Sequence, residues 1–313
     1  MGVLSVRIGA RSSRLSQAQT GIVSDLIRKE MQDQVAIEFV PVKTLGDRTP
    51  PSARGRFGEG GEKAAFTGDI EALLLKGKID IAIHSMKDLP SEQTEGLTIG
   101  ATPARNDPRD ALVSRSGETF KSLPKGAKVG TSSLRRKAQL LELRRDIEVV
   151  ELHGNVDSRL RKVGSGGDGK LHAIVLAVAG LERIGEGGRI SQTFSIDDMV
   201  PAVGQGIIAV QMRRDDRDVG KLLSRIDDEV TALESRCERA FASRIGADCS
   251  VPVGGCARAS GSKIRMVGIL AKEDGSELRR KALDGKRGEE VALGTRLAEE
   301  LLSSGLGRGG AAA

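Results

Sequence analysis

The sequence feature that most constrains the fold is an alternation of short β-branched runs with amphipathic stretches over the first two-thirds of the chain. Strand-like runs such as 4–8 and 35–42 are separated by a segment in which Leu15, Ala18 and Ile22 recur at helical spacing. This order is typical of α/β layers around a largely parallel sheet. Further strands are predicted at 79–83, 128–129, 148–152, 172–177 and 207–212.

A short motif occurs twice, as RIGARSS at 7–13 and as KVGTSS at 128–133. Each copy ends a predicted strand with a glycine and places a pair of serines before a predicted helix. The repetition predicts two similar lobes. Pro, Gly and charged residues interrupt the pattern at 104–110 and 200–206, and we interpret both segments as crossings between the lobes.

The resulting prediction is a first domain of 1–104 with 207–224, a second of 109–200 and a third of 228–304. The third contains a long predicted helix at 229–244, short strands such as 263–270 and a final helix at 288–302, which suits a small α+β domain. We expect 45–61 to be a long mobile loop over a site and 305–313 to be a disordered tail.

The composition excludes several classes of protein. With no Trp, no Tyr and six Phe among 313 residues, the chain lacks the aromatic platforms of single-stranded nucleic-acid binders. Its net charge of +6 is spread along the sequence, which suits small anionic substrates. The start has no apolar signal region, and no run reaches the roughly 18 apolar residues of a membrane span. We expect a cytoplasmic protein with neither nucleic-acid nor membrane partners.

The chain has three cysteines, an odd number, and we expect it in a reducing compartment. Both points favour a single reactive thiol over a disulfide. Cys249 lies in the Gly- and Pro-bounded segment ADCSVPVGG, where it should be more accessible than Cys237 on a predicted helix. Cys256 follows seven residues after Cys249, and the three histidines lie far away in sequence, so we expect no metal site.

Basic and small polar residues follow four of the predicted strands, where open α/β sheets bind their ligands. Serines that open helices favour carboxylate or phosphate groups, and arginine pairs with carboxylates through two hydrogen bonds. The alternative is that each arginine is solvated and each serine only caps a helix. Recurrence at several strand ends favours binding for the set, which is Arg11 to Ser13, 84–88, 131–136, and 153–155 with Arg159.

Asp88 is the lone carboxylate of the segment HSMKD, beside Lys87 and His84. A carboxylate in a cationic cleft can receive an N–H proton or stabilise a developing cation. The alternative is an ordinary ion pair with Lys87. We interpret His84 and Met86 as structural.

Five motifs together resemble the ordered signatures of the porphobilinogen deaminase (hydroxymethylbilane synthase) family. They are HSMKDLP at 84–90, GTSSLRR at 130–136, GNV at 154–156 with Arg159, PAVGQG at 201–206 and CSVPVG at 249–254. The likeness runs in order from about Val6 to Leu270. The expected fold is α/β, with two similar doubly wound, periplasmic-binding-protein-like lobes plus a small α+β C-terminal domain.

The resemblance implies a transferase of tetrapyrrole, porphyrin and heme biosynthesis. It would condense four porphobilinogen molecules head to tail, with loss of ammonia, and then release the linear tetrapyrrole by hydrolysis. It also implies a dipyrromethane cofactor in thioether linkage to Cys249, and Asp88 as the group that contacts pyrrole nitrogens and handles protons. A monomer without an obligate protein partner is expected.

The resemblance further implies two sets of binding residues. One departure matters, because His153 stands where the family usually has arginine before Gly-Asn-Val, and a histidine, unlike an arginine, need not be charged at neutral pH. The implied cofactor-binding residues are Cys249, Ser13, Lys87, Ser133, Arg135, Arg136, His153 and Arg159, and the implied substrate-binding residues are Arg11, Arg159, Arg183, Lys63 and Phe66.

Two rival functions are open at this stage. Two α/β lobes with basic strand ends also describe solute-binding proteins without chemistry, although such a protein has no use for the Cys249 segment. An anion-sensing regulator would need a DNA-reading module, and no segment of helix-turn-helix size is left over for one.

Overall fold

The structure is a computed structural model and describes residues 4–32, 34–49, 61–164, 171–246, 252–272 and 274–303. The chain divides into two compact units, Met1–Asn106 with Ile207–Ala232, and Asp107–Gly206 with Leu233–Ala313. The three domain boundaries given above stay a prediction. The expected tail at 305–313 and most of the expected loop at 45–61 lie outside the described residues.

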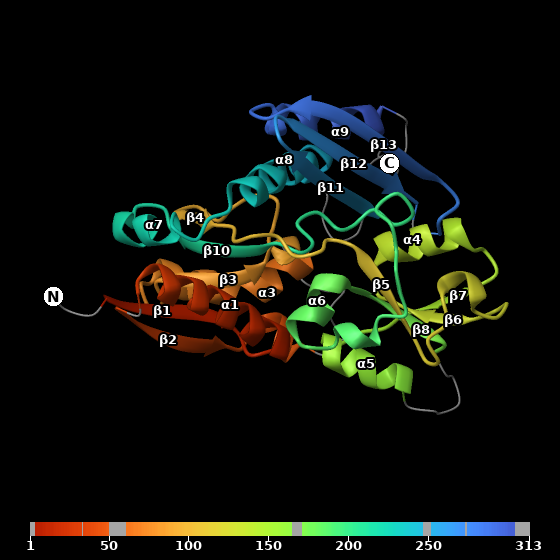
Figure 1. Cartoon of the computed structure of the whole chain (residues 1–313), viewed down its shortest axis with the longest axis horizontal. Coiled ribbons are helices and arrows are strands. Elements are labelled where there is room, and N and C mark those ends of the chain that lie inside the picture. Colours follow the sequence, from red (N-terminus) through yellow and green to blue (C-terminus); the bar gives the residue numbers. More distant parts are fainter. Residues whose placement is uncertain are drawn as a thin grey trace, which may run out of the picture. The chain divides into compact units, whose positions relative to one another are not determined.

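A five-stranded mixed sheet organises the first unit, in the order β2-β1-β3-β10-β4 (Figure 1). β1 (Leu4–Arg11) pairs in parallel with β2 (Val35–Val42) and β3 (Ile81–Ser85), whereas β10 (Ile208–Arg213) runs antiparallel between β3 and β4 (Leu97–Ala101). The expectation of a largely parallel sheet is confirmed for β1 to β4, which run in the same direction, and β10 is the antiparallel strand among these five. The reason is that β10 enters from a distant part of the chain and not through a βαβ crossover.

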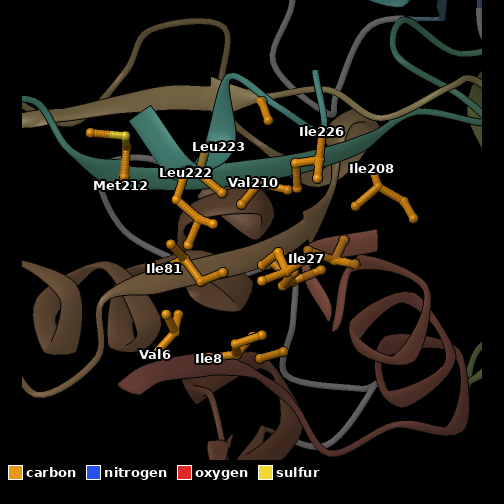
Figure 2. Packing of buried hydrophobic residues seen from close by; sticks show 14 of the residues in the cluster. Val6, Ile8, Ile27, Ile81, Ile208, Val210, Met212, Leu222, Leu223 and Ile226 are labelled. Atoms are coloured by element: carbon orange, nitrogen blue, oxygen red, sulfur yellow. The ribbon is translucent and has the colours of Figure 1, made fainter. Parts of the chain in front are cut away.

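One face of this sheet is covered by α1 (Arg14–Glu30) and α7 (Arg217–Leu223). Because side chains alternate across a strand, Ile81 and Ile83 point to the same face of β3, and both belong to the core that contains Ile27 of α1. Figure 2 shows Ile8 and Ile81 of the sheet with Ile27 and Leu222 of the helices. This packing fixes the strand ends that carry the polar residues.

The opposite face of the same sheet is covered by α3 (Gly61–Leu75). Ala82, between Ile81 and Ile83, packs in a second core with Ile70 and Leu74 of this helix. Helices on both faces make the unit doubly wound. Residues 45–48, expected in the loop, form the short helix α2 (Leu45–Arg48).

The second unit repeats this pattern in a sheet of order β7-β6-β8-β5-β9. β6 (Lys128–Gly130) is parallel to β7 (Glu148–Val150) and β8 (Ala173–Ala177), and β5 (Asp110–Ser114) runs antiparallel to β8 and to β9 (Gln192–Thr193). The expected pair of similar doubly wound lobes is confirmed. The helices of this second lobe are α4 (Leu134–Leu143), α5 (Val156–Gly164) and α6 (Val178–Arg183).

The repeated serine motif has the same local structure in both units. Ser13 is the N-cap of α1 and accepts a hydrogen bond from the Ser16 amide at 3.3 Å. Ser133 is the N-cap of α4 and accepts one from the Arg136 amide at 3.4 Å. Each serine thus satisfies a backbone donor that the first turn of a helix leaves unpaired.

The C-terminal part is α+β, as expected. The antiparallel strands β11 (Val253–Ser260), β12 (Lys263–Ala271) and β13 (Leu278–Lys286) pack with α8 (Glu229–Ile245) and α9 (Glu290–Leu302) (Figure 1). Among the described residues, no helix has the length and apolar character required to span a bilayer.

Close contact between α8 and α9 depends on Gly294, where an added Cβ would lie 2.1 Å from the carbonyl oxygen of Cys237. We predict that Gly294→Ala destabilises the protein by about 1–3 kcal/mol, because the two helices must separate. Gly21→Ala is the matched control, since Gly21 lies in α1 with nothing within 4 Å of such a Cβ, and it should stabilise by about 0.5–1 kcal/mol. Urea unfolding measures both, and equal effects would contradict this packing.

Candidate active site

A pocket of about 50 Å³ lies in the first unit at the carboxyl ends of β1 and β3. The first turn of α1 and part of α3 complete its wall. Four of the sequence-predicted site residues meet here: Arg11, Ser13, Phe66 and Asp88. The other lining residues are Leu15, Ser16, Gln19, Thr67, Ile83, His84 and Ser85.

Asp88 ends a short 3-10 helix, η2 (Met86–Asp88), that follows β3 directly. The backbone is anchored one turn earlier, where the buried Met86 donates its amide hydrogen to the carbonyl oxygen of Ile207 at 3.0 Å. Asp88 itself is half-buried and makes no hydrogen bond or ion pair with any residue that the structure describes. The alternative of an ion pair with Lys87 is therefore not found there.

Arg11 lies at the end of β1 and already holds a carboxylate. Its guanidinium pairs with Asp47 at two points, through Nη2 and through Nε at 3.2 Å, and lies 4.3 Å from the centre of the Phe66 ring. Asp47 also accepts a 2.8 Å hydrogen bond from Thr44 Oγ1. Burial acts to raise the pKa of Asp47, but the hydrogen bonds from Arg11 and Thr44 outweigh it and lower that pKa.

Sequence reasoning missed Asp47, because it assigned 45–61 to a loop. The available signal was the capping box of Thr44 and Asp47, which the structure forms at the start of α2. Gln19 was also missed, and its side-chain amide donates to Ser85 Oγ at 2.9 Å. Two further site residues were predicted for the first unit. Lys87 is half-buried, and the side chain of Lys63 is not among those that the structure describes.

In the second unit, Arg135 and Arg136 converge on the fully buried Asp110. Arg135 Nη1 donates to Asp110 Oδ2 at 2.7 Å, and Arg136 donates to Asp110 Oδ1 from Nη2 at 2.7 Å and from Nε at 3.0 Å. Both arginines are 5% exposed. Their predicted cofactor-binding role is not tested by these contacts.

The charges of this cluster do not balance, since two guanidinium groups face one carboxylate. Burial acts to raise the pKa of Asp110, but attraction to Arg135 and Arg136 overcomes it and holds that pKa well below its usual range. Burial lowers the pKa of Arg135, and its Nε is sealed from solvent and has no hydrogen-bond partner among the residues that the structure describes. A residual positive potential is therefore built into the N-terminal end of α4.

Three further predicted residues of the second unit have local partners. His153 Nε2 lies 2.7 Å from Glu151 Oε1, and Arg159 Nε donates to the carbonyl oxygen of Gly154 at 2.7 Å. Arg183 Nη2 donates to the carbonyl oxygen of Gly206 at 2.6 Å. Burial lowers the pKa of Arg183 to about 10, so it keeps its charge at neutral pH.

Two of the three cysteines are buried. Cys237 is inaccessible, and burial raises the pKa of its thiol to about 12, while Cys256 is 1% exposed in β11. Neither is a ready nucleophile, since the thiolate is the reactive form. Cys249 lies outside the described residues.

Comparison with known proteins decides the family. A family model described as "Porphobilinogen deaminase, dipyromethane cofactor binding domain" matches residues 6–221, and one described as "Porphobilinogen deaminase, C-terminal domain" matches 232–303. This chain belongs to the porphobilinogen deaminase family. It is 44% identical over 302 residues to a porphobilinogen deaminase of Pelotomaculum thermopropionicum, covering 96% of this chain and 95% of that protein.

A second relative agrees with this family assignment. A porphobilinogen deaminase of Roseiflexus sp. (strain RS-1) is 44% identical over 299 residues, covering 95% of this chain and 96% of that protein. Among solved structures, the methionine binding protein MetQ aligns with a TM-score of 0.44 and 13% identity over 73% of this chain and 92% of that chain.

The Asp110 cluster makes the stability of this porphobilinogen deaminase family member depend on pH. Asp110→Asn should destabilise by about 3–5 kcal/mol at pH 7, because it leaves two buried guanidinium groups without a counter-charge. The folded-state pKa of Asp110 is lowered. The difference in free energy of unfolding between wild type and Asp110→Asn should therefore be largest above about pH 4, the pKa of Asp in an unfolded chain, and shrink below it.

Urea unfolding of both proteins from pH 7 down to pH 3 measures this difference. Asp25→Asn, on the exposed face of α1, is the control and should change little. A difference between wild type and Asp110→Asn that stays constant down to pH 3 would contradict this account.

Proposed function

We propose that Asp88 is the catalytic group with which this chain carries out the reaction of its family. As a member of that family the chain is a transferase, a hydroxymethylbilane synthase of tetrapyrrole biosynthesis, and its substrate is porphobilinogen. The observation that supports the role of Asp88 is its carboxylate without a partner among the described residues, in a pocket at the strand ends. Family membership also removes the two rivals, a solute-binding protein and an anion-sensing regulator.

The proposed role of Asp88 follows from the chemistry of the substrate. When the bond between the aminomethyl carbon and nitrogen breaks, its electron pair leaves with ammonia, and positive charge spreads over the ring to the pyrrole nitrogen. A fixed carboxylate opposite that nitrogen stabilises the charge at the moment it forms. The 3-10 turn after β3 fixes the backbone of Asp88 before substrate arrives.

The acetate and propionate groups of the substrate need cationic partners. We assign them to Arg11, Arg159, Arg183 and Lys63, with Phe66 as packing surface. Arg11 supports this assignment because it binds the Asp47 carboxylate at two points, the preferred geometry between arginine and carboxylate, and a substrate carboxylate would replace Asp47 there.

The family match includes a dipyrromethane cofactor domain. Such a group carries negatively charged carboxylates. The start of α4 has an excess positive charge and the sealed Arg135 Nε, so its charge is opposite to that of the cofactor. When bound, the cofactor supplies the pyrrole carbon to which each new unit is joined. We propose that Cys249 holds it by a thioether, and that Ser13, Lys87, Ser133, Arg135, Arg136, His153 and Arg159 contact its carboxylates.

Two properties of the whole protein belong to the same proposal. We propose that the enzyme works in the cytoplasm. We also expect it to work as a monomer without an obligate protein, nucleic-acid or membrane partner.

Replacement of Asp88 by Asn should lower kcat by about 100- to 1,000-fold, because the neutral amide cannot balance the forming cation. Porphobilinogen consumption and ammonia release measure the rate, and Asp88→Glu, which keeps the charge, should retain more activity than Asp88→Asn. A variant Asp88→Asn with wild-type kcat would refute the catalytic role.

Thiol reactivity tests the assignment of the attachment site. In folded protein, iodoacetamide should leave Cys237 and Cys256 unmodified because both are buried, whereas both should react after unfolding in guanidinium. Peptide mass mapping locates the label. Rapid labelling of Cys237 or Cys256 in the folded state would contradict the assignment, since either could then carry the cofactor.

A further inference from the structure

His84 is a buried polar residue of the Asp88 pocket that the reaction described above does not use. It is 6% exposed, lies in β3 four residues before Asp88, and lines the same pocket. Its Nε2 is sealed from solvent and makes no hydrogen bond that satisfies ordinary geometry among the described residues. A buried ring nitrogen of this kind needs an explanation.

A series of hydrogen-bonded polar groups, of which Glu71 and Gln211 are buried, lies behind the ring. Thr94 Oγ1 donates to Glu71 Oε2 at 2.8 Å, and Gln211 Nε2 donates to Glu71 Oε1 at 2.8 Å. Oε1 of Gln211 is sealed as well, and the His84 ring interacts with the Gln211 side chain. The two sealed atoms, one on the ring and one on the amide, are thus each other's natural partners.

These hydrogen bonds determine which nitrogen of the His84 ring carries the hydrogen. Both carboxylate oxygens of Glu71 act as acceptors, so the amide nitrogen of Gln211 must face Glu71 and its oxygen must face the ring. An oxygen there requires the hydrogen on His84 Nε2, which leaves Nδ1 as an acceptor. Burial lowers the pKa of His84 to about 4, so the ring is neutral at physiological pH.

We infer that His84 is a substrate-binding residue, whose Nδ1 accepts a hydrogen bond from the aminomethyl ammonium group of porphobilinogen beside Asp88. Gln211 and Glu71 are positioning residues that hold the ring in this tautomer. This inference rests on the proposed function and deepens it, because it assigns the end of the pocket that receives the leaving group.

The charges at the pocket support an ammonium ligand. Arg11 is balanced by Asp47, the His84 ring is neutral, and Asp88 has no partner among the described residues. A carboxylate and a neutral imidazole together offer acceptors without adding positive charge. These two acceptors favour a cation rich in N–H donors at their end of the pocket, whereas Arg11 lies at the part that we assign to a carboxylate.

The contact should act on binding more than on the chemical step. As the carbon–nitrogen bond breaks, the electron pair moves to nitrogen and the ammonium loses its charge, so its hydrogen bond to Nδ1 weakens. An interaction that weakens only partly in the transition state acts mainly on KM, and its loss leaves kcat unchanged or slightly raised. Asp88, which faces the growing charge on the ring, acts mainly on kcat.

Two variants separate a role of Nδ1 from a structural role of Nε2. His84→Asn keeps a polar atom near the position of Nδ1 but cannot reach Gln211, whereas His84→Gln can reach Gln211 but leaves the Nδ1 position empty. We expect His84→Gln to raise KM for porphobilinogen about tenfold or more with kcat within about threefold, as for a lost hydrogen bond to a charged group. His84→Asn should stay closer to the wild-type KM.

Steady-state kinetics with cofactor-loaded protein, together with the melting temperature of each variant, measure these effects. If KM rises in His84→Asn and not in His84→Gln, or rises equally in both, the ring acts through Gln211 and the inference is overturned. It is also overturned if neither variant changes KM. A wild-type protein that consumes no porphobilinogen would instead refute the proposed function itself.

Discussion

The second unit depends on one fully buried carboxylate, Asp110, that binds two arginines of the same helix. Through Arg135 and Arg136 it joins the start of β5 to α4, and Arg135 Nη1 reaches on to the carbonyl oxygen of Val200 at 2.6 Å. Burial of three charges costs far more than burial of apolar groups, so the cluster persists only with this geometry. It also leaves an excess positive charge at the start of α4, where we propose that a polycarboxylate cofactor binds.

At the corresponding strand ends of the first unit, the charge that lacks a partner within the described part of the chain is negative and not positive. There the arginine at the end of β1 is neutralised by Asp47, and the carboxylate at the end of β3 has no partner among the described residues. The repeated fold therefore holds a buried excess of positive charge in the second unit and, among the described residues, an unpaired carboxylate in the first. In the proposed enzyme, Arg135 and Arg136 of the second unit contact carboxylates of the cofactor, and Asp88 of the first unit stabilises a cation formed from the substrate.

The sequence predicted elements whose signals are local. Each strand predicted in the first two-thirds of the chain overlaps an observed one, and Ser13 and Ser133 cap helices as their motifs indicate. It did not predict β5, because Asp110 lies in a segment that Pro and charge mark as a crossing, nor the antiparallel entry of β10. Pairing of Asp110 with residues 25 and 26 positions later has no periodic signature. His84 carries no local signal of a binding role either, because Gln211, which its ring contacts, lies far along the chain.

The central claim is that this chain builds its product on a dipyrrole held by Cys249. The most direct test is the intact mass of the purified protein and of a Cys249→Ser variant, before and after addition of porphobilinogen. The account predicts an excess mass of one dipyrromethane in the wild type, growth in pyrrole-sized steps, and neither in the variant. An unmodified wild-type mass, from cells able to make the cofactor and with no growth on adding porphobilinogen, would contradict it.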